Sequence, residues 1–213
     1  GVRNVSVSGC TFMGTDVGLR FKSVRGRGGV VENIWFSDID MINIPSQAIS
    51  FNMYYGGLSV SEMLAEGGNV ETTTSEIPPV TEETPRFRKI SIKNITCRGA
   101  LQAIYLQGLP ELNLDDIVFE NIMIEAENGM ACIDADGVTM NNIRIIAKHQ
   151  PLIRFLNSRN VSIDGLEVQE NMDSAVVIKG EKSQNISVKT LYGARESFVI
   201  FGEEVDRSKV KIQ

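Results

Sequence analysis

One motif recurs along this chain, and its spacing limits the possible fold more than any other feature. The motif is a polar turn residue, apolar-x-apolar, two polar residues and a second apolar-x-apolar. Its seven copies lie at 4–12, 33–41, 89–97, 116–124, 137–145, 160–168 and 185–191. Each half alternates with a period of two, which is the period of β-strands. Five of the six steps between copies are 21 to 29 residues long, so the sequence predicts a repeat architecture.

A second alternating run follows each copy, as at 17–22, 48–53 and 103–108. The connections are rich in Gly, Asn and Asp, which favour turns, and no repeat shows a helical pattern. Such a unit cannot bury its apolar face alone and must stack on its neighbours. We therefore predict an all-β fold, a right-handed parallel β-helix (a solenoid) of about seven coils that forms a single segment over 1–213.

The sixth step is 56 residues long and contains one coil plus an insertion, which we place at 56–86. Connections of this length are usually functional or disordered. The insertion follows Tyr55, so we expect it to lie over the same face as Arg20 and Lys22.

Composition excludes several classes of function. A net charge of −6 argues against general nucleic-acid binding, although an anionic substrate responds to local charge instead. The sequence has no membrane-spanning run, and 1–20 lack a signal-peptide pattern. Cys10, Cys97 and Cys132 fall in or near the repeating apolar positions, so we predict three buried thiols. With no Cys or His cluster, we expect no zinc site and no cofactor.

Strand alternation sets apart one polar face in the first two coils. Leu19 and Phe21 point one way, and Arg20 and Lys22 point the other way. The same alternation in the next coil adds Asn52 and, at its end, Tyr54 to the face of the two cations. Two interpretations stay open for this face, namely ordinary solvated charges or a binding surface for an anion.

Other candidate residues have ordinary explanations. Asp115 and Asp116 form a carboxylate pair, and Asp134 and Asp136 form another, but both pairs occupy turn positions. We interpret all four as turn residues. The single histidine, His149, is predicted to lie in a surface turn.

Asparagine recurs where each strand begins. Glycosylation is one interpretation of the Asn-x-Ser/Thr sites, which are Asn4, Asn94, Asn160 and Asn185. We favour another, in which Asn recurs because it tolerates the left-handed backbone conformation of a turn.

Gly18-Leu19-Arg20-Phe21-Lys22, followed one coil later by Tyr55, resembles the family 28 glycoside hydrolases, which are the polygalacturonases and their relatives. The runs 79–88 and 106–111 are similar to bacterial pectin-degrading members. The resemblance covers essentially the whole chain, but only the C-terminal half of the usual domain.

The resemblance implies a right-handed parallel β-helix and inverting hydrolysis of galacturonide linkages in pectic cell-wall polysaccharides. It also implies a secreted or periplasmic parent enzyme and an acidic oligosaccharide or polysaccharide as partner. The family's Asn-Thr-Asp, Asp-Asp and Gly-His-Gly motifs are absent, so no catalytic residue carries over and we expect this chain alone to be inactive. Only Arg20, Lys22 and Tyr55 carry over, as substrate-binding groups, with Tyr54 as a neighbour that can replace Tyr55 and Asn52 beside them.

Two other classes stay open, a non-catalytic carbohydrate-binding solenoid and a structural β-solenoid. The apolar side chains of the first coil, among them Val5, Val7 and Phe12, have nothing upstream in this chain to cover them. We therefore expect missing N-terminal coils of the same β-helix to be a partner. At the other end, we expect the charged segment 203–213 to fold over the last coil.

Overall fold

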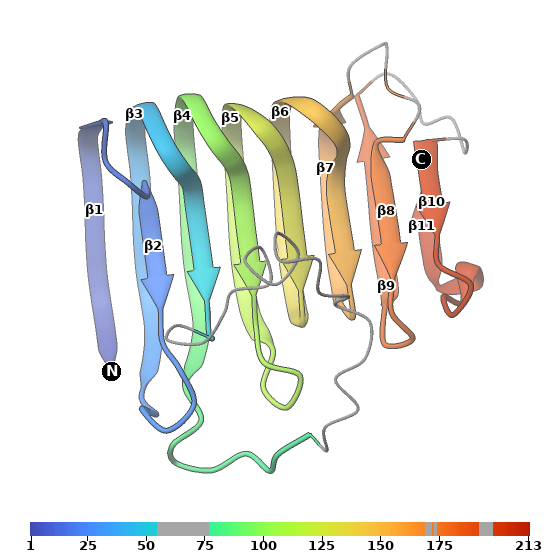
Figure 1. Ribbon diagram of the computed structural model, residues 1–213, viewed down its shortest axis with the longest axis horizontal. Coiled ribbons are helices and arrows are strands. Elements are labelled where there is room, and N and C mark those ends of the chain that lie inside the picture. Colours follow the sequence, from blue (N-terminus) through green and yellow to red (C-terminus); the bar gives the residue numbers. More distant parts are fainter. Residues whose placement is uncertain (55–76, 169–171, 173, 192–197) are drawn as a thin grey trace.

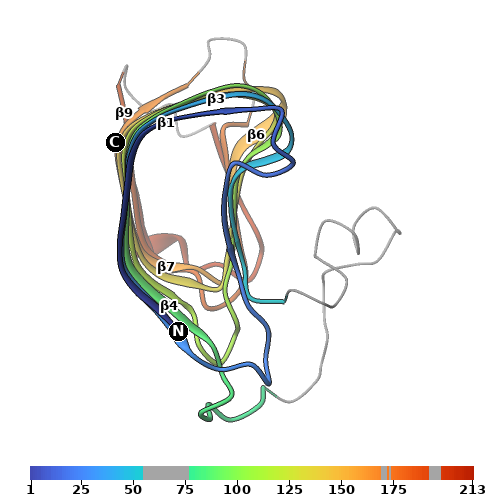
Figure 2. The same cartoon turned by 90° about the vertical axis from the view of Figure 1, so that its left-hand side faces the viewer.

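The chain winds into a right-handed parallel β-helix (Figure 1). In this computed structural model, each coil rises at the back, crosses over the top and descends in front as the chain advances to the right. The structure describes residues 1–54, 77–168, 172, 174–191 and 198–213. Viewed along the axis, successive coils lie over one another in a single outline (Figure 2). The predicted fold class and handedness are therefore confirmed.

Long strands run around the corners of the coils, so the middle coils are nearly continuous ribbons. The elements are β1 (Val2–Met13), β2 (Leu19–Lys22), β3 (Val30–Asn52), β4 (Arg86–Gln107), β5 (Leu114–Ile133), β6 (Ala135–Leu156), β7 (Arg159–Glu167), β8 (Val176–Lys179), β9 (Gln184–Thr190), β10 (Val199–Phe201), the 3-10 helix η2 (Arg207–Lys209) and β11 (Val210–Ile212). The described part of the chain contains no helix long and apolar enough to cross a membrane.

All pairings are parallel and form two rows. The first row runs β1-β3-β4-β5-β6-β7-β9-β11 along the repeated motif. The second row contains β2, the C-terminal parts of β3 to β6, then β8 and β10. The register aligns the repeats as the sequence spacing predicts, so Val5 pairs with Ile34 and Ile34 with Ile90. About seven coils are confirmed, and β11 begins one more.

The core is a stack of apolar side chains that lie one above another in successive coils. Ile90, Ile117 and Val138 are each no more than 1% exposed and occupy equivalent positions in β4, β5 and β6. In the first coils the stack is aromatic, because the rings of Phe21 and Phe51 lie 4.1 Å apart and nearly parallel. Since each coil covers its neighbour, burial is complete only where a coil has a neighbour on both sides.

Turn residues with positive φ mark the corners, as predicted for asparagine. The four predicted sites Asn4, Asn94, Asn160 and Asn185 have φ between 51° and 57°. At one corner the side chains also bond from coil to coil. We call Asp38, Asn94, Asn121 and Asn142 the asparagine ladder, because each amide donates to the oxygen of the residue before it, at 2.8, 2.9 and 2.9 Å.

The two ends of the rod test two expectations, and the structure corrects the one for Cys10. Cys97 and Cys132 are buried as predicted, but Cys10 is only half-buried, because β1 has a neighbouring coil on one side only. Val2 and Met13 of the same strand are 50% and 69% exposed. At the C-terminus, 210–212 stack on the last coil, in agreement with the expectation for this charged segment. They form β11, which pairs with β9 and extends the first row.

Candidate functional site

The outward side of the second row, here called the second-row face, carries the predicted binding residues. Outward side chains form two columns along the rod, aligned by strand register. One column begins Arg20, Ser50, Tyr105, and the other begins Lys22, Asn52, Gln107. The first coils thus place two cations beside hydroxyl and amide groups, which is the chemistry that binds an anionic, hydroxylated ligand.

The cations lie where strand alternation predicted. Leu19 and Phe21 are buried in the core, whereas Arg20 and Lys22 are exposed. The stacking of Phe21 on Phe51 fixes the strand beneath them. Ser50, Tyr105 and Gln107 also point outward but are 3 to 6% exposed, and the Tyr105 hydroxyl donates to Gln107 Oε1 at 2.5 Å. The face therefore changes from charged and exposed to polar and buried within two coils.

Three side chains from three successive coils join at the edge of this face. We call Arg25, Tyr54 and Glu111 the Arg25 clamp. Arg25 donates to both carboxylate oxygens of Glu111, at 2.5 and 2.8 Å, and its guanidinium lies 4.9 Å from the centre of the Tyr54 ring. Arg25 Nη2 also donates to the Tyr54 hydroxyl at 3.4 Å. The clamp therefore fixes Tyr54 beside Asn52, whose Oδ1 accepts the Tyr54 backbone N–H at 2.7 Å.

Charge in the clamp is strongly stabilised. The hydrogen bond to Glu111 raises the pKa of Arg25 above its usual value. Burial is the largest influence on Glu111, whose side chain is 3% exposed, and acts to raise its pKa. The hydrogen bond from Arg25, a backbone hydrogen bond and the Arg25 charge together outweigh burial, so the pKa is lowered. Burial raises the pKa of the Tyr54 hydroxyl. Both members of the ion pair are thus charged at neutral pH, and Tyr54 stays a neutral phenol.

Asp134 lies at the turn after β5, close enough to the clamp to interact electrostatically with Arg25 and Glu111. It is 8% exposed, and its Oδ1 is buried without a hydrogen-bond partner. Burial raises the pKa of this carboxyl group to about 6, while Lys182 opposes the shift. The turn assignment is confirmed by a φ of 48°, but the expected ordinary turn aspartate is a buried, weakly acidic group.

A cavity of about 330 Å³, partly lined by Glu111 of the clamp, opens along the same edge of the rod. We call it the Lys182 groove. Its charged lining comes from four successive coils and comprises Arg86, Glu111, Asp115, Asp136, Arg159 and Lys182. Glu111 belongs to both the groove and the clamp, so the two sites are contiguous. The groove was not predictable from the sequence, because its walls combine the first residues of β4 to β7 with turn residues that share no motif.

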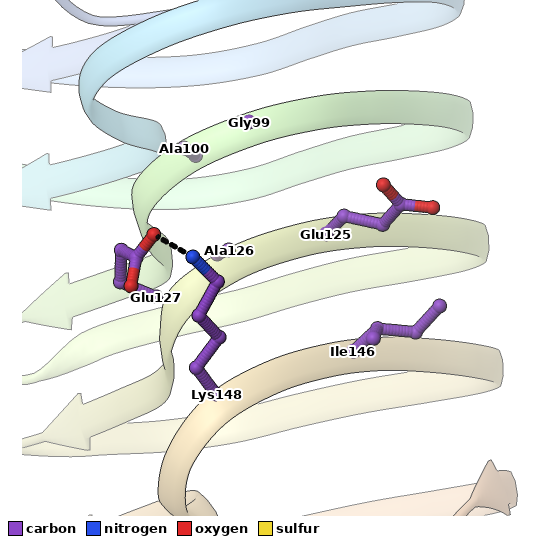
Figure 3. Close-up of a pocket in the computed structure, with 7 residues that line it drawn as sticks. All are labelled: Gly99, Ala100, Glu125, Ala126, Glu127, Ile146 and Lys148. Carbon is purple, nitrogen blue, oxygen red and sulfur yellow. Dashed lines mark hydrogen bonds and ion pairs between the residues drawn. The ribbon is translucent and has the colours of Figure 1, made fainter.

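A second cavity, of about 230 Å³, lies at a different corner of the coils (Figure 3). Its walls are Ala and Gly backbone with few side chains, and the Lys148 ammonium bonds Glu127 at 2.6 Å across one end. Gly99, with φ of 81°, allows the chain to turn there. This shallow corner offers few groups that would bind a ligand.

The other candidate residues from the sequence form ion pairs, occupy turns or lie on the surface. Asp115 pairs with Arg86 at 3.2 Å, and Asp136 pairs with Arg159 at 2.8 Å. Asp116 has a φ of 52°, as expected in a turn. His149 is exposed as predicted, but it lies within β6 and not in a turn. Tyr55 and most of the predicted insertion lie outside the described residues, and β4 already begins at Arg86. Within the described ranges, no group of three or more His, Cys, Asp or Glu side chains could hold a metal ion.

The N-terminal part of the chain is similar to a known protein family. Residues 1–76 match the model of the family described as glycosyl hydrolases family 28. Over residues 1–76, the chain is similar to the family 28 glycoside hydrolases. A search of curated proteins and a search of solved structures found no match. The family suggested by Arg20, Lys22 and Tyr55 is therefore confirmed, and at family level it indicates a glycosidase.

The family 28 match covers part of the site. Arg20, Lys22, Asn52, Tyr54 and Tyr55 lie within it. Glu111, Asp134 and the lining of the Lys182 groove lie C-terminal to it. The clamp therefore joins Arg25 and Tyr54, inside the matched segment, to Glu111 outside it.

Proposed function

We propose that this chain is the substrate-binding portion of a polygalacturonase-like glycoside hydrolase, which hydrolyses galacturonide linkages in pectic polysaccharides by inversion. Arg20 and Lys22 bind sugar carboxylates, while Asn52, Tyr54 and Tyr55 contact the sugar ring and its hydroxyls. The observation that carries the proposal is the arrangement of Arg20 and Lys22 on one exposed strand face, in register with Ser50 and Asn52, inside the family 28 segment.

The chemistry of the two cations suits an acidic sugar. The Arg guanidinium offers a planar fork that can bind both oxygens of a carboxylate, and the Lys ammonium offers a compact charge. Side chains two apart on a strand lie about 6.6 Å from each other. This spacing allows both cations to contact one sugar residue, or one cation to contact each of two neighbouring residues.

The proposal assigns no catalytic carboxylate to residues 1–213. Inverting hydrolysis needs one carboxylic acid that protonates the leaving oxygen and a carboxylate that activates water from the opposite side. We therefore expect the purified 213-residue chain to release no reducing sugar from polygalacturonate. Release above that of a heat-denatured sample would show that the chain contains its own acid and base.

Substitution of the cations tests the binding role. In the full-length protein, Arg20→Ala and Lys22→Ala should each reduce kcat/KM on oligogalacturonides about tenfold or more, because a charge-assisted hydrogen bond contributes roughly 1.5–3 kcal/mol. Fully methyl-esterified oligomers, which are neutral, should lose little. Arg98→Ala is the matched control, since Arg98 is an exposed cation of the first row. Equal losses on acidic and neutral oligomers would contradict carboxylate binding.

A further inference from the structure

The Lys182 groove lies along the edge of the second-row face that carries the Arg25 clamp, and its volume suits one small polar ligand. A volume of about 330 Å³ lies near the lower end of the range for small-molecule sites. The groove therefore accommodates about one sugar ring. Its walls come from consecutive coils held in register by β4 to β7, so the cavity is built on rigid strands.

Ion pairing leaves one charge of the lining uncompensated. Arg86 is paired with Asp115, Arg159 with Asp136, and Glu111 with Arg25. Lys182 has no ion-pair partner among the residues that the structure describes. Its charge acts on the buried carboxyl group of Asp134. The groove thus combines one available ammonium with three carboxylates already held by arginines.

Two buried polar atoms around the groove also lack partners. Arg86 binds Asp115 through Nη2 alone, and its Nε is buried without an acceptor. Asp134 Oδ1, beside Lys182 and Glu111, is buried without a donor. Unpaired buried polar groups are rare in folded proteins, and each calls for an explanation. Arg86 itself lines the groove, and a ligand oxygen is the kind of acceptor that its Nε lacks.

We propose that the Lys182 groove is a second binding site for one carboxylate-bearing sugar unit. Lys182 binds the carboxylate, and the hydroxyls bind Asp115, Asp136 and Asn113, whose side chains line the groove. Carboxylates and amides that hydrogen-bond hydroxyls position the ring, and the ammonium selects an acidic sugar over a neutral one.

This proposal rests on the proposed function for one point, that the unit belongs to the same acidic polysaccharide. The path between the two sites is continuous in side chains. Lys22 pairs in register with Asn52, Asn52 bonds Tyr54, Tyr54 contacts Arg25, and Arg25 bonds Glu111 in the groove wall. Lys182 lies about five coils from Lys22, because Lys179 is the fifth residue in register after Lys22. This separation is about 24 Å at about 4.8 Å per coil. An oligomer long enough to cover that distance contacts both sites.

Calorimetric titration of the full-length protein with galacturonate oligomers of one to six units tests the proposal. Affinity should rise by about tenfold or more once the oligomer reaches the groove, because a second linked contact adds to the first. Lys182→Ala should remove that rise and leave the affinity of the shortest oligomers that bind the Arg20 site unchanged. Lys182→Arg, which keeps the charge, should retain most of it. Arg98→Ala again serves as the control, and circular dichroism verifies that each variant folds.

The variants separate the two proposals. If Arg20→Ala weakens binding and Lys182→Ala affects the binding of no oligomer, the proposal of a binding site in the Lys182 groove is wrong and the proposed function stands. If Lys182→Ala weakens binding and Arg20→Ala does not, the groove stands and the assignment of Arg20 is wrong. If galacturonate oligomers bind neither site, both proposals are wrong. Equal binding of a neutral galactose oligomer would also overturn the role of Lys182.

Discussion

Two edges of the rod deal with polar groups in opposite ways. At the asparagine ladder every side chain bonds to its equivalent in the next coil, so the polar groups there satisfy one another. At the edge formed by the Arg25 clamp and the Lys182 groove, bonds cross between unlike residues, and Asp134 Oδ1 and Arg86 Nε have no partner. The ladder is an edge built for stacking. The clamp edge carries unsatisfied groups, as expected where a protein binds something else.

We expect the largest effect from a substitution that removes hydrogen bonds of the asparagine ladder. Asn121→Ala removes two ladder hydrogen bonds of 2.9 Å and places alanine at a φ of 55°. Two hydrogen bonds at about 1 kcal/mol each, plus about 1–2 kcal/mol for the left-handed backbone, suggest a loss of about 3 kcal/mol. Urea unfolding monitored by circular dichroism measures the loss. Asn121→Gly tolerates the backbone and should lose less, so equal losses would contradict the backbone contribution.

We expect the next largest effect from a substitution of Asp134, the buried carboxyl group of the clamp edge. Burial raises the pKa of Asp134 to about 6 from an ordinary value of 3.8, so the folded protein holds the proton more tightly than the unfolded chain. Stability from this group is therefore present at low pH and falls as pH rises from about 4 to about 6. Asp134→Asn removes the ionisation and keeps a residue that tolerates a φ of 48°.

We expect Asp134→Asn to raise the free energy of unfolding by about 2 kcal/mol at pH 7 and by little at pH 4. Unfolding curves at both pH values measure the difference. An equal change at the two pH values would show that the carboxyl group titrates normally in the folded protein.

A third change compares ion pairs on the two edges. Glu111→Gln keeps the shape of the clamp but removes the charge that binds Arg25, and we expect a loss of about 1.5 kcal/mol from this nearly buried pair. Glu120→Gln is the matched control, because Glu120 pairs with Lys93 at 2.7 Å on the exposed first row. Thermal unfolding of both variants should show the larger shift for Glu111. Equal shifts would mean that the clamp is an ordinary surface pair.

The smallest effect belongs to the shallow corner of Figure 3. Lys148 bonds Glu127 at 2.6 Å, but the two side chains are 72% and 41% exposed. Exposed pairs contribute little, so Lys148→Ala should change stability by less than about 0.5 kcal/mol. Thermal unfolding at low and high salt measures it. A larger, salt-dependent loss would show that this corner resembles the clamp edge.

The sequence correctly predicted the features of the fold that follow from the repeated motif. Positions such as Ile34 and Ile90 recur at fixed intervals, and stacking then determines register, burial and the left-handed corners. The last strand, β11, was missed because Val210 to Ile212 is too short to show a period. Cys10 was assigned by its repeat position, but burial depends on a neighbouring coil as well as on the position.

The site was predictable only in part. Arg20, Lys22 and Asn52 followed from strand alternation, which is a local property. Arg25 and Glu111 lie 86 residues apart in two irregular turns, so no local pattern could pair them. Asp134 occupies a turn position that any Asp or Asn fits, and its burial comes from neighbouring coils that the local sequence does not describe.

The strand ends on either side of the predicted insertion are tied down separately from it. The Met53 backbone N–H bonds Gln107 in the next coil, and the Arg86 N–H bonds Gly29 in the previous one. The Gly26 and Gly28 N–H groups also bond the Glu83 carbonyl. Each anchor belongs to the stack and is independent of the length of chain between them. Because lengthening a loop with fixed ends costs little free energy, the rod can accept changes in the length of chain between these anchors. A lineage built on this scaffold can therefore lengthen or shorten the chain between Met53 and Arg86 without evolving a new fold.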